Sequence, residues 1–111
     1  MSALPTRLLF ICSRNKLRSP TAEAVLNGID GVEAISAGTN NDSETPLSGD
    51  LIEWADAIYV MERQHQKKVT QKFKTQLKDK DLHILGIADD YRYMDSALVT
   101  LIKRKFPRWF G

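Results

Sequence analysis

Four short apolar runs divide the chain, and segments with apolar residues at helical spacing lie between and after them. The four runs are Arg7–Cys12, Val32–Ala37, Ala57–Met61 and Leu82–Leu85. The first contains four consecutive apolar residues, which is typical of a strand that is buried on both faces. The pattern therefore predicts four short strands.

Helices are predicted after each of the first two strands. Ser19 and Pro20 combine an N-cap residue with a proline at the first helical position, and Gly28 is placed to end this helix. Thr45 and Pro46 repeat the same start signal before the second helix. The apolar positions of the second helix are Leu47, Leu51 and Trp54.

Two further helices are predicted in the second half of the chain. The apolar stripe of the third consists of Val69, Phe73 and Leu77. Its other faces carry lysines, as expected of an amphipathic surface helix. The fourth begins after a capping Asp95 and stops near Pro107. Its apolar positions are Leu98, Leu101 and Ile102.

Strands that alternate with helices indicate an α/β fold in which a parallel sheet is covered by helices on both faces. Right-handed crossovers restrict the topology to a small doubly wound four-stranded sheet. No repeat, low-complexity tract or linker interrupts the pattern, so residues 1–111 are expected to form a single domain.

Composition and charge narrow the function classes. Hydrophobic residues make up 42% of the chain and charged residues 27%, which is ordinary for a globular protein. The net charge of +2 gives no reason to expect nucleic-acid binding, and the basic segments 67–80 and 103–108 are interpreted as solvated helix faces. No apolar stretch reaches membrane-spanning length, and the first residues do not resemble a signal peptide. We therefore expect a cytoplasmic protein.

The cysteine count excludes further classes. With one Cys and two His, the chain offers neither an internal disulfide nor a thiolate-rich metal site. Redox chemistry that uses a second, resolving Cys of the same chain is excluded as well. No metal or cofactor is expected.

The segment from Cys12 to Pro20 carries the candidate chemistry, and it lies between the first predicted strand and the first predicted helix. In an open α/β sheet, ligands bind at the carboxyl ends of strands beside helix N-termini, which attract anions. The Cys-x5-Arg spacing places a thiol at one end of the loop and a guanidinium at the other. The intervening amides are expected to turn inward around a tetrahedral oxyanion, and Arg18 to bind two of its oxygens.

The same surroundings favour the ionised form of the thiol, so Cys12 is interpreted as a nucleophile that attacks a bound phosphoryl group. Ser19 is placed to donate a hydrogen bond to the sulfur. Each residue also has a plain structural interpretation, because a lone Cys is usually a small buried hydrophobe and Ser19 a helix cap. The buried strand before the motif and the capped helix after it favour the nucleophile.

Four blocks of the chain resemble the low-molecular-weight protein tyrosine phosphatases, in the order in which that family has them. They are LLFICSRNKLRSPTAEAVL (8–26), ISAGT (35–39), ADAIYVMERQH (55–65) and IADDYRYMD (87–95). The first resembles the family signature, the second and third its strands, and the last its general-acid loop. The chain resembles a short variant of the family.

The resemblance implies a role for each matching position. Cys12 would be the nucleophile, Arg18 the phosphate clamp and Asp89 the general acid. Asn15 would hold the loop shape with a left-handed backbone. Tyr91 and Tyr93 would line the pocket for an aryl ring. The expected substrate-binding residues are Ser13, Arg14, Asn15, Lys16, Leu17, Ser19 and Tyr91.

The chain departs from the family pattern at several positions. Arg14 stands where the family usually has Gly, and Leu17 where it often has a second Cys, so a protective disulfide there is excluded. Asp90 replaces the Pro that usually follows the general acid, which leaves Asp90 as an alternative acid. The segment between Gly38 and Leu51 is expected to be trimmed, giving a lower pocket wall.

These features predict hydrolysis of phosphomonoesters through a cysteinyl phosphate. Protein phosphotyrosine is the expected substrate, and a small aryl phosphate is the alternative. A lower pocket wall would also admit phosphoserine or nucleotide phosphates. Two alternatives stay open. One is arsenate reduction, which would need an external thiol because the chain has one Cys. The other is a module that binds phosphate without turnover.

Overall fold

The computed structural model describes residues 5–110. Its elements, in chain order, are β1 (Thr6–Cys12), α1 (Arg18–Leu26), β2 (Val32–Gly38), α2 (Gly49–Trp54), β3 (Ala57–Val60), α3 (Arg63–Lys72), β4 (Asp81–Ile84), α4 (Ser96–Lys105) and α5 (Pro107–Phe110).

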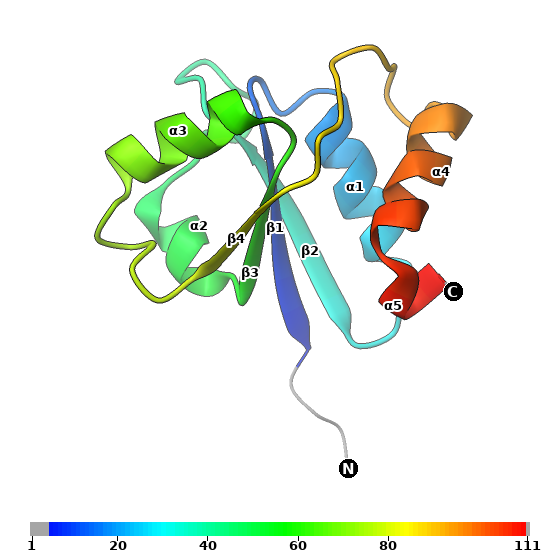
Figure 1. Cartoon of the computed structure of the whole chain (residues 1–111), viewed down its shortest axis with the longest axis horizontal. Helices are drawn as coiled ribbons and strands as arrows, with labels where there is room; N and C mark the ends of the chain where they lie inside the picture. The colour runs from blue at the N-terminus through cyan, green and yellow to red at the C-terminus, as the bar shows by residue number, and fades with distance from the viewer. Residues whose placement is uncertain (1–4, 111) are drawn as a thin grey trace.

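The four strands form one parallel sheet in the order β2-β1-β3-β4, which confirms the predicted fold class (Figure 1). From β1 the chain crosses to one side through α1 to reach β2, and then returns through α2 to β3 on the other side of β1. The sheet therefore has its topological switch point between β1 and β3. Ligands of open α/β sheets bind at this point, outside the carboxyl ends of the strands.

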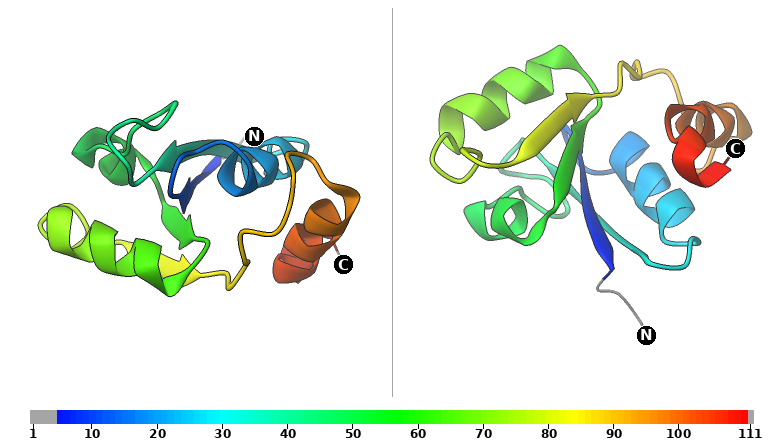
Figure 2. Two further views of the ribbon diagram at one scale, coloured as in Figure 1. Left: turned by 90° about the horizontal axis from the view of Figure 1, so that it is seen from above. Right: turned by 60° about the horizontal axis from the view of Figure 1, so that its bottom comes forward.

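Alternate residues of β1 build two cores. Leu8, Phe10 and Cys12 belong to a cluster shared with α1 and α4, while Leu9 and Ile11 belong to a second cluster shared with α2 and α3. Accordingly, α1, α4 and α5 lie on one side of the sheet and α2 and α3 on the other (Figures 1 and 2). This confirms that β1 is buried on both faces and fixes the position of the loop that follows it.

Two helix starts differ from the prediction. Helix α1 begins at Arg18, with Leu17 at the N-cap, so Ser19 lies inside the helix and its hydroxyl is used by Asn15 and Cys12 instead. Helix α2 begins at Gly49, where Ser48 Oγ accepts a hydrogen bond from the Leu51 amide. The predicted cap residues Thr45 and Pro46 lie upstream, and Pro46 forms an isolated bridge with Gly38.

Later elements show smaller differences. Helix α3 ends at Lys72, before the predicted Phe73 and Leu77, although both side chains still pack on the second core. Asp95 caps α4 as predicted, with Oδ1 accepting from the Ala97 amide at 3.0 Å. Strand β4 is a largely exposed edge strand and begins one residue earlier than expected.

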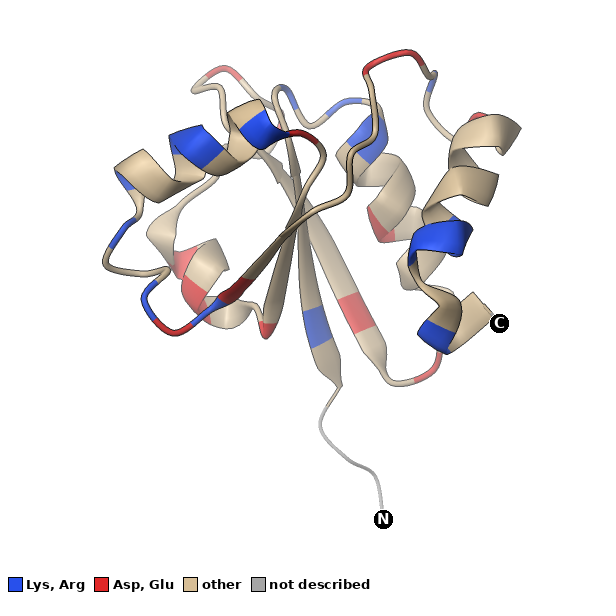
Figure 3. Cartoon of the chain, viewed as in Figure 1, with Lys and Arg blue, Asp and Glu red and all other residues tan. Residues whose placement is uncertain are grey.

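Residues Pro107–Phe110 form the short helix α5, which was not predicted. Phe106 belongs to the first core, and the half-buried Trp109 packs on it with ring centroids 5.9 Å apart. Lys and Arg residues lie along α3, at the end of α4 and in α5 (Figure 3). The side chains of those within residues 63–72 and 103–108 are exposed. Within residues 5–110, no helix has both the length and the apolar character needed to cross a bilayer.

Candidate active site

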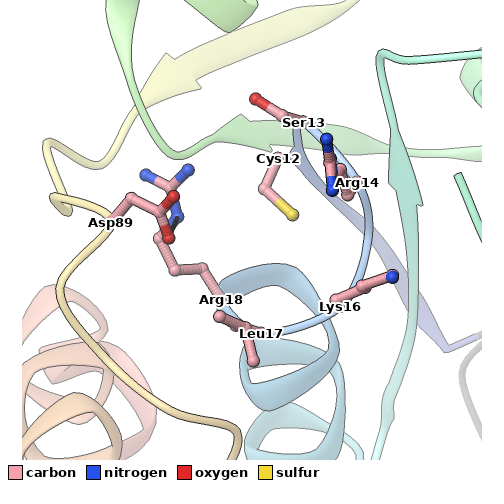
Figure 4. A pocket seen from close by; sticks show the side chains of 7 residues that line it. All are labelled: Cys12, Ser13, Arg14, Lys16, Leu17, Arg18 and Asp89. Carbon is pink, nitrogen blue, oxygen red and sulfur yellow. Dashed lines mark ion pairs between the residues drawn. The ribbon is translucent and has the colours of Figure 1, made fainter.

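A pocket of about 490 Å³ opens at the carboxyl end of β1, within the size range of small-molecule sites (Figure 4). It is lined by Cys12, Ser13, Arg14, Lys16, Leu17, Arg18 and Asp89. Cys12 is 4% exposed, so its sulfur lies at the bottom of the pocket. The 13–18 loop surrounds this floor, as the sequence predicted.

The carbonyl groups of the loop point away from the pocket. The Thr39 amide donates to Cys12 O and the Asn40 amide donates to Ser13 O, each at 2.9 Å. Within residues 5–110 no peptide bond is cis, so the N–H that follows each of these carbonyls points to the opposite side. The amides of Ser13 and Arg14 therefore face the inside of the loop, where they are free to bind an oxyanion.

Gly38, at the end of β2, permits this contact between the 39–44 segment and the loop. A Cβ at Gly38 would lie 2.2 Å from Ser43 Oγ and 2.7 Å from Ser13 O. Ser43 Oγ lies 3.0 Å from Ser13 O and 2.6 Å from Asn40 O, and its single hydrogen is directed to one of these two carbonyls at a time. The 39–44 segment therefore contacts the loop from outside. It is not among the residues that line the pocket, on the side where a lower wall was expected.

Asn15 has the left-handed backbone conformation that was expected of it, with φ at 59°. Asn is one of the few residues that adopt this conformation readily. The side chain is 5% exposed and turns inward, where Oδ1 accepts a hydrogen bond from Ser19 Oγ at 3.0 Å. Asn15 and Ser19 therefore hold the loop from behind the pocket and do not line it.

Ser19 also lies against the candidate nucleophile, with Oγ 2.9 Å from Cys12 Sγ. A hydroxyl has one hydrogen to donate, so two arrangements exist. When the sulfur carries its proton, S–H donates to Ser19, and Ser19 donates to Asn15. When the sulfur is ionised, the Ser19 hydroxyl is free to turn and donate to the thiolate.

Arg18 is held by one of its nitrogens. Nη1 donates to Glu62 Oε1 at 2.6 Å and to Ile87 O at 2.7 Å. The hydrogen bonds found within residues 5–110 leave Nε and Nη2 for the pocket, and these two nitrogens form the edge that a guanidinium uses for bidentate binding. The hydrogen bond from Arg18 lowers the pKa of Glu62, so this carboxylate stays ionised and continues to hold the Arg18 guanidinium.

Asp89 lies on the far side of the pocket from the loop, with Oδ1 3.7 Å from Arg18 Nε (Figure 4). Of the two candidate acids, Asp89 lines the pocket and Asp90 does not. Tyr91 is half-buried against the first core and is also outside the lining. Ser13, Arg14, Lys16 and Leu17, all predicted to bind substrate, do line it.

His65 was not predicted to belong to the site. Its ring is fully buried, and Nε2 lies 2.9 Å from Ser13 Oγ. Nδ1 accepts the Glu62 amide at 3.0 Å as part of a capping box at the start of α3. The sequence signal was the spacing Glu62-x-x-His65 directly after a buried strand, which resembles an N-terminal box. Burial lowers the pKa of His65 to about 4, with a smaller effect from Arg18, so the ring is neutral at pH 7.

The described residues contain no group of three or more His, Cys, Asp or Glu side chains that would suit a metal ion. The chemistry available in the pocket comes from the Cys12 sulfur, inward-facing amides, the buried Arg18 guanidinium and the Asp89 carboxyl group. Together they suit attack on a tetrahedral oxyanion, with a proton supplied to the leaving group.

Comparison with known proteins agrees with this geometry. The profile of the family described as low molecular weight phosphotyrosine protein phosphatase matches residues 7–85. The YwlE arginine phosphatase from Geobacillus stearothermophilus is 24% identical, with a TM-score of 0.73 over 94% of this chain and 92% of that one. No curated protein sequence matches the chain.

Two further solved structures that resemble the chain are both of proteins named Wzb. Wzb from Escherichia coli K30, a tyrosine phosphatase in complex with phosphate, is 20% identical with a TM-score of 0.76, over 96% of this chain and 97% of that one. Vibrio vulnificus Wzb in complex with benzylphosphonate is 23% identical with a TM-score of 0.75, over 95% and 97%. The whole fold of these proteins is thus represented here.

Proposed function

The chain belongs to the low molecular weight phosphotyrosine protein phosphatases, a family of cysteine-dependent phosphatases, and we propose that it hydrolyses protein phosphotyrosine through a cysteinyl phosphate. The observation that carries this proposal is the position of the Cys12 sulfur. It lies at the bottom of a pocket whose wall combines inward-facing amides with Arg18 and Asp89.

In the first step the Cys12 thiolate attacks phosphorus from the floor of the pocket. The bond between phosphorus and the phenolic oxygen breaks, and Asp89 gives its proton to that oxygen, so a neutral phenol leaves. The amides of Ser13 and Arg14 and the Nε–Nη2 edge of Arg18 bind the phosphoryl oxygens while negative charge builds up on them. Cys12 then carries the phosphoryl group and Asp89 is ionised.

In the second step water attacks the phosphorus of the cysteinyl phosphate. Asp89 accepts a proton from this water, and the sulfur leaves as a thiolate with inorganic phosphate as the product. Ser19 donates its hydrogen bond to the departing sulfur, since the hydroxyl lies 2.9 Å from it. Both the thiolate and the protonated acid are thereby restored for the next cycle.

An aryl phosphate suits the depth of the pocket. Because Cys12 is 4% exposed, a phosphate must sit at the end of a long side chain to reach it, and a Tyr side chain reaches further than Ser or Thr. Leu17 is 38% exposed at the pocket and offers an apolar surface for the ring. We expect substrate in the form of a phosphorylated protein or a small aryl phosphate, met in the cytoplasm.

Phosphoarginine is the second substrate to test, because the YwlE relative is described as an arginine phosphatase. The reach of an Arg side chain also suits the recessed sulfur. Arg14 and Lys16 line the pocket, however, and their positive charge opposes the positive charge that a guanidino group can carry. The pocket therefore favours the neutral phenol ring.

The proposal is tested by measuring kcat/KM for matched peptides that differ only in carrying phosphotyrosine, phosphoserine or phosphoarginine, with chelator present. We expect phosphotyrosine to be preferred over phosphoserine by at least about a hundredfold, since the shorter side chain does not reach Cys12. Preference for phosphoarginine would refute the substrate assignment. Release of phosphate from no peptide, with vanadate still bound, would refute the reaction.

A further inference from the structure

His65 is a buried titratable residue that has no role in the two steps above. Its ring makes one hydrogen bond to the Ser13 hydroxyl and one to the Glu62 amide, at 2.9 and 3.0 Å. We propose that His65 is a positioning residue that fixes Ser13, and through Ser13 the loop amides that bind the phosphoryl oxygens. This inference deepens the proposed function and rests on it.

The two contacts settle which nitrogen of the ring carries the hydrogen. Nδ1 accepts a hydrogen bond from the Glu62 amide, so it has no hydrogen of its own. In a neutral imidazole the hydrogen is then on Nε2. His65 therefore donates from Nε2 to Ser13 Oγ, and the contact has a fixed direction.

The contact from His65 adds a second point at which Ser13 is held. Its carbonyl is already held from outside by the Asn40 amide, and the Arg14 amide points the opposite way, into the loop. The bond from His65 holds the side chain of Ser13 as well. With both groups held, the 13–14 peptide is set in the orientation that an oxyanion requires.

The N-terminus of α3 thus holds both ends of the loop. Glu62, the N-cap residue, binds Arg18 at the end of the loop, and His65, three residues later, binds Ser13 at its start. The two residues are also linked to each other by the capping box. Both ends of the loop are therefore bound by the same turn of helix.

Two substitutions of His65 separate the two hydrogen bonds. An Asn side chain places its oxygen near Nδ1 and keeps the bond to the Glu62 amide, but it does not reach Ser13. A Gln side chain places its NH₂ near Nε2 and keeps a donor for Ser13. His65→Gln is therefore the rescue variant, and Ser13→Ala removes the same bond from the other side.

The experiment measures vanadate inhibition and kcat/KM for p-nitrophenyl phosphate in wild type, His65→Asn, His65→Gln, Ser13→Ala and the Ser13→Ala/His65→Asn double variant. Melting temperatures are recorded for each. We expect His65→Asn and Ser13→Ala each to weaken vanadate binding and kcat/KM by about tenfold, the value of one buried hydrogen bond. His65→Gln should stay within about threefold of wild type, and the double variant should be no worse than His65→Asn.

Equal losses in His65→Gln and His65→Asn, or losses that multiply in the double variant, would overturn the proposal. So would wild-type vanadate affinity in Ser13→Ala, which also decides the matter if the His65 variants do not fold. If wild type binds vanadate but turns over no substrate, the proposed function fails. The vanadate affinities of the variants then still test the positioning role.

Discussion

Glu62 Oε1 lies 2.6 Å from Arg18 Nη1, and this pair joins two residues 44 positions apart in the chain. The same nitrogen donates to Ile87 O, so the end of the 13–18 loop is tied to two segments that follow the inner strand β3 and the edge strand β4. A guanidinium held through one nitrogen keeps the orientation of its opposite edge. The guanidinium of Arg18 is therefore oriented for anion binding before any anion is bound.

Replacing Arg18 with Lys tests this arrangement. A Lys ammonium is a point charge without a planar fork, so it cannot hold Glu62 and bind two phosphoryl oxygens at once. We expect kcat/KM for p-nitrophenyl phosphate to fall by at least about a hundredfold, comparable to the loss of an oxyanion-hole donor. Arg14→Lys is the matched control, because Arg14 lines the pocket with an exposed side chain, and it should change kcat/KM less than about threefold. Equal losses of kcat/KM in Arg18→Lys and Arg14→Lys would contradict the role of Arg18 in bidentate phosphate binding.

The two aspartates of the 89–90 pair are expected to differ. Asp89 lines the pocket and Asp90 does not. With phenyl phosphate, whose leaving group needs protonation, Asp89→Asn should lower kcat by about a hundredfold or more, whereas Asp90→Asn should leave it within about twofold. The decrease in kcat caused by Asp89→Asn should be smaller with p-nitrophenyl phosphate, because nitrophenolate leaves without a proton. If Asp90→Asn lowered kcat more than Asp89→Asn, the general acid would be Asp90 instead.

Gly38→Ala should damage the loop without touching the pocket. The added Cβ would lie 2.2 Å from Ser43 Oγ and 2.7 Å from Ser13 O, and the second of these is a backbone atom that cannot move aside easily. We expect a loss of about 1–3 kcal/mol in unfolding free energy, with weaker vanadate binding. Denaturant titration checks this. Gly28→Ala is the control, because its Cβ would meet only Val25 O, at an ordinary 3.5 Å. Equal stability of the two variants would contradict the close approach.

The stability of the protein should fall in mild acid because of His65. Burial lowers the pKa of His65 to about 4, followed in effect by the charge of Arg18. Lys68 lowers this pKa further, while Glu62 and Asp89 raise it. Between the unfolded pKa of about 6.5 and the folded one, the unfolded chain binds a proton that the folded protein does not. The unfolding free energy should therefore drop by about 2 kcal/mol from pH 7 to pH 5.

Denaturant midpoints at the two pH values measure this drop. His65→Gln has no ring to protonate, so its unfolding free energy should change by less over the same interval. The lowered pKa of Glu62 adds its own loss only at more acid pH, below the range of the test. An equal pH dependence in wild type and His65→Gln would contradict the assignment.

The sequence alone was sufficient for the sheet, because apolar runs and capped helical segments alternate without ambiguity. It was less successful with helix starts, since Ser19 is an N-cap residue by type but uses its hydroxyl for Cys12 and Asn15. Tertiary contacts of this kind override a local signal. The same cause explains Pro46, which pairs with Gly38 rather than starting α2.

Within the site, the sequence identified the residues of the contiguous loop and missed their supports. Cys12 and Arg18 follow one another at a fixed spacing, so a local pattern reveals them. Glu62 and His65 reach the loop only because β3 pairs with β1 in parallel and delivers the start of α3 beside it. No local sequence pattern indicates that β3 pairs with β1.

The central claim is that Cys12 carries the phosphoryl group during turnover, and acid-quench mass spectrometry tests it most directly. Asp89→Asn is mixed with excess p-nitrophenyl phosphate, quenched in acid within a turnover and digested, with Cys12→Ala as the control. We predict one phosphoryl group on the Cys12 peptide of Asp89→Asn, and neither that adduct nor turnover in Cys12→Ala. Nitrophenol release by Cys12→Ala at the wild-type rate, with the Cys12 peptide unmodified in Asp89→Asn, would contradict the account.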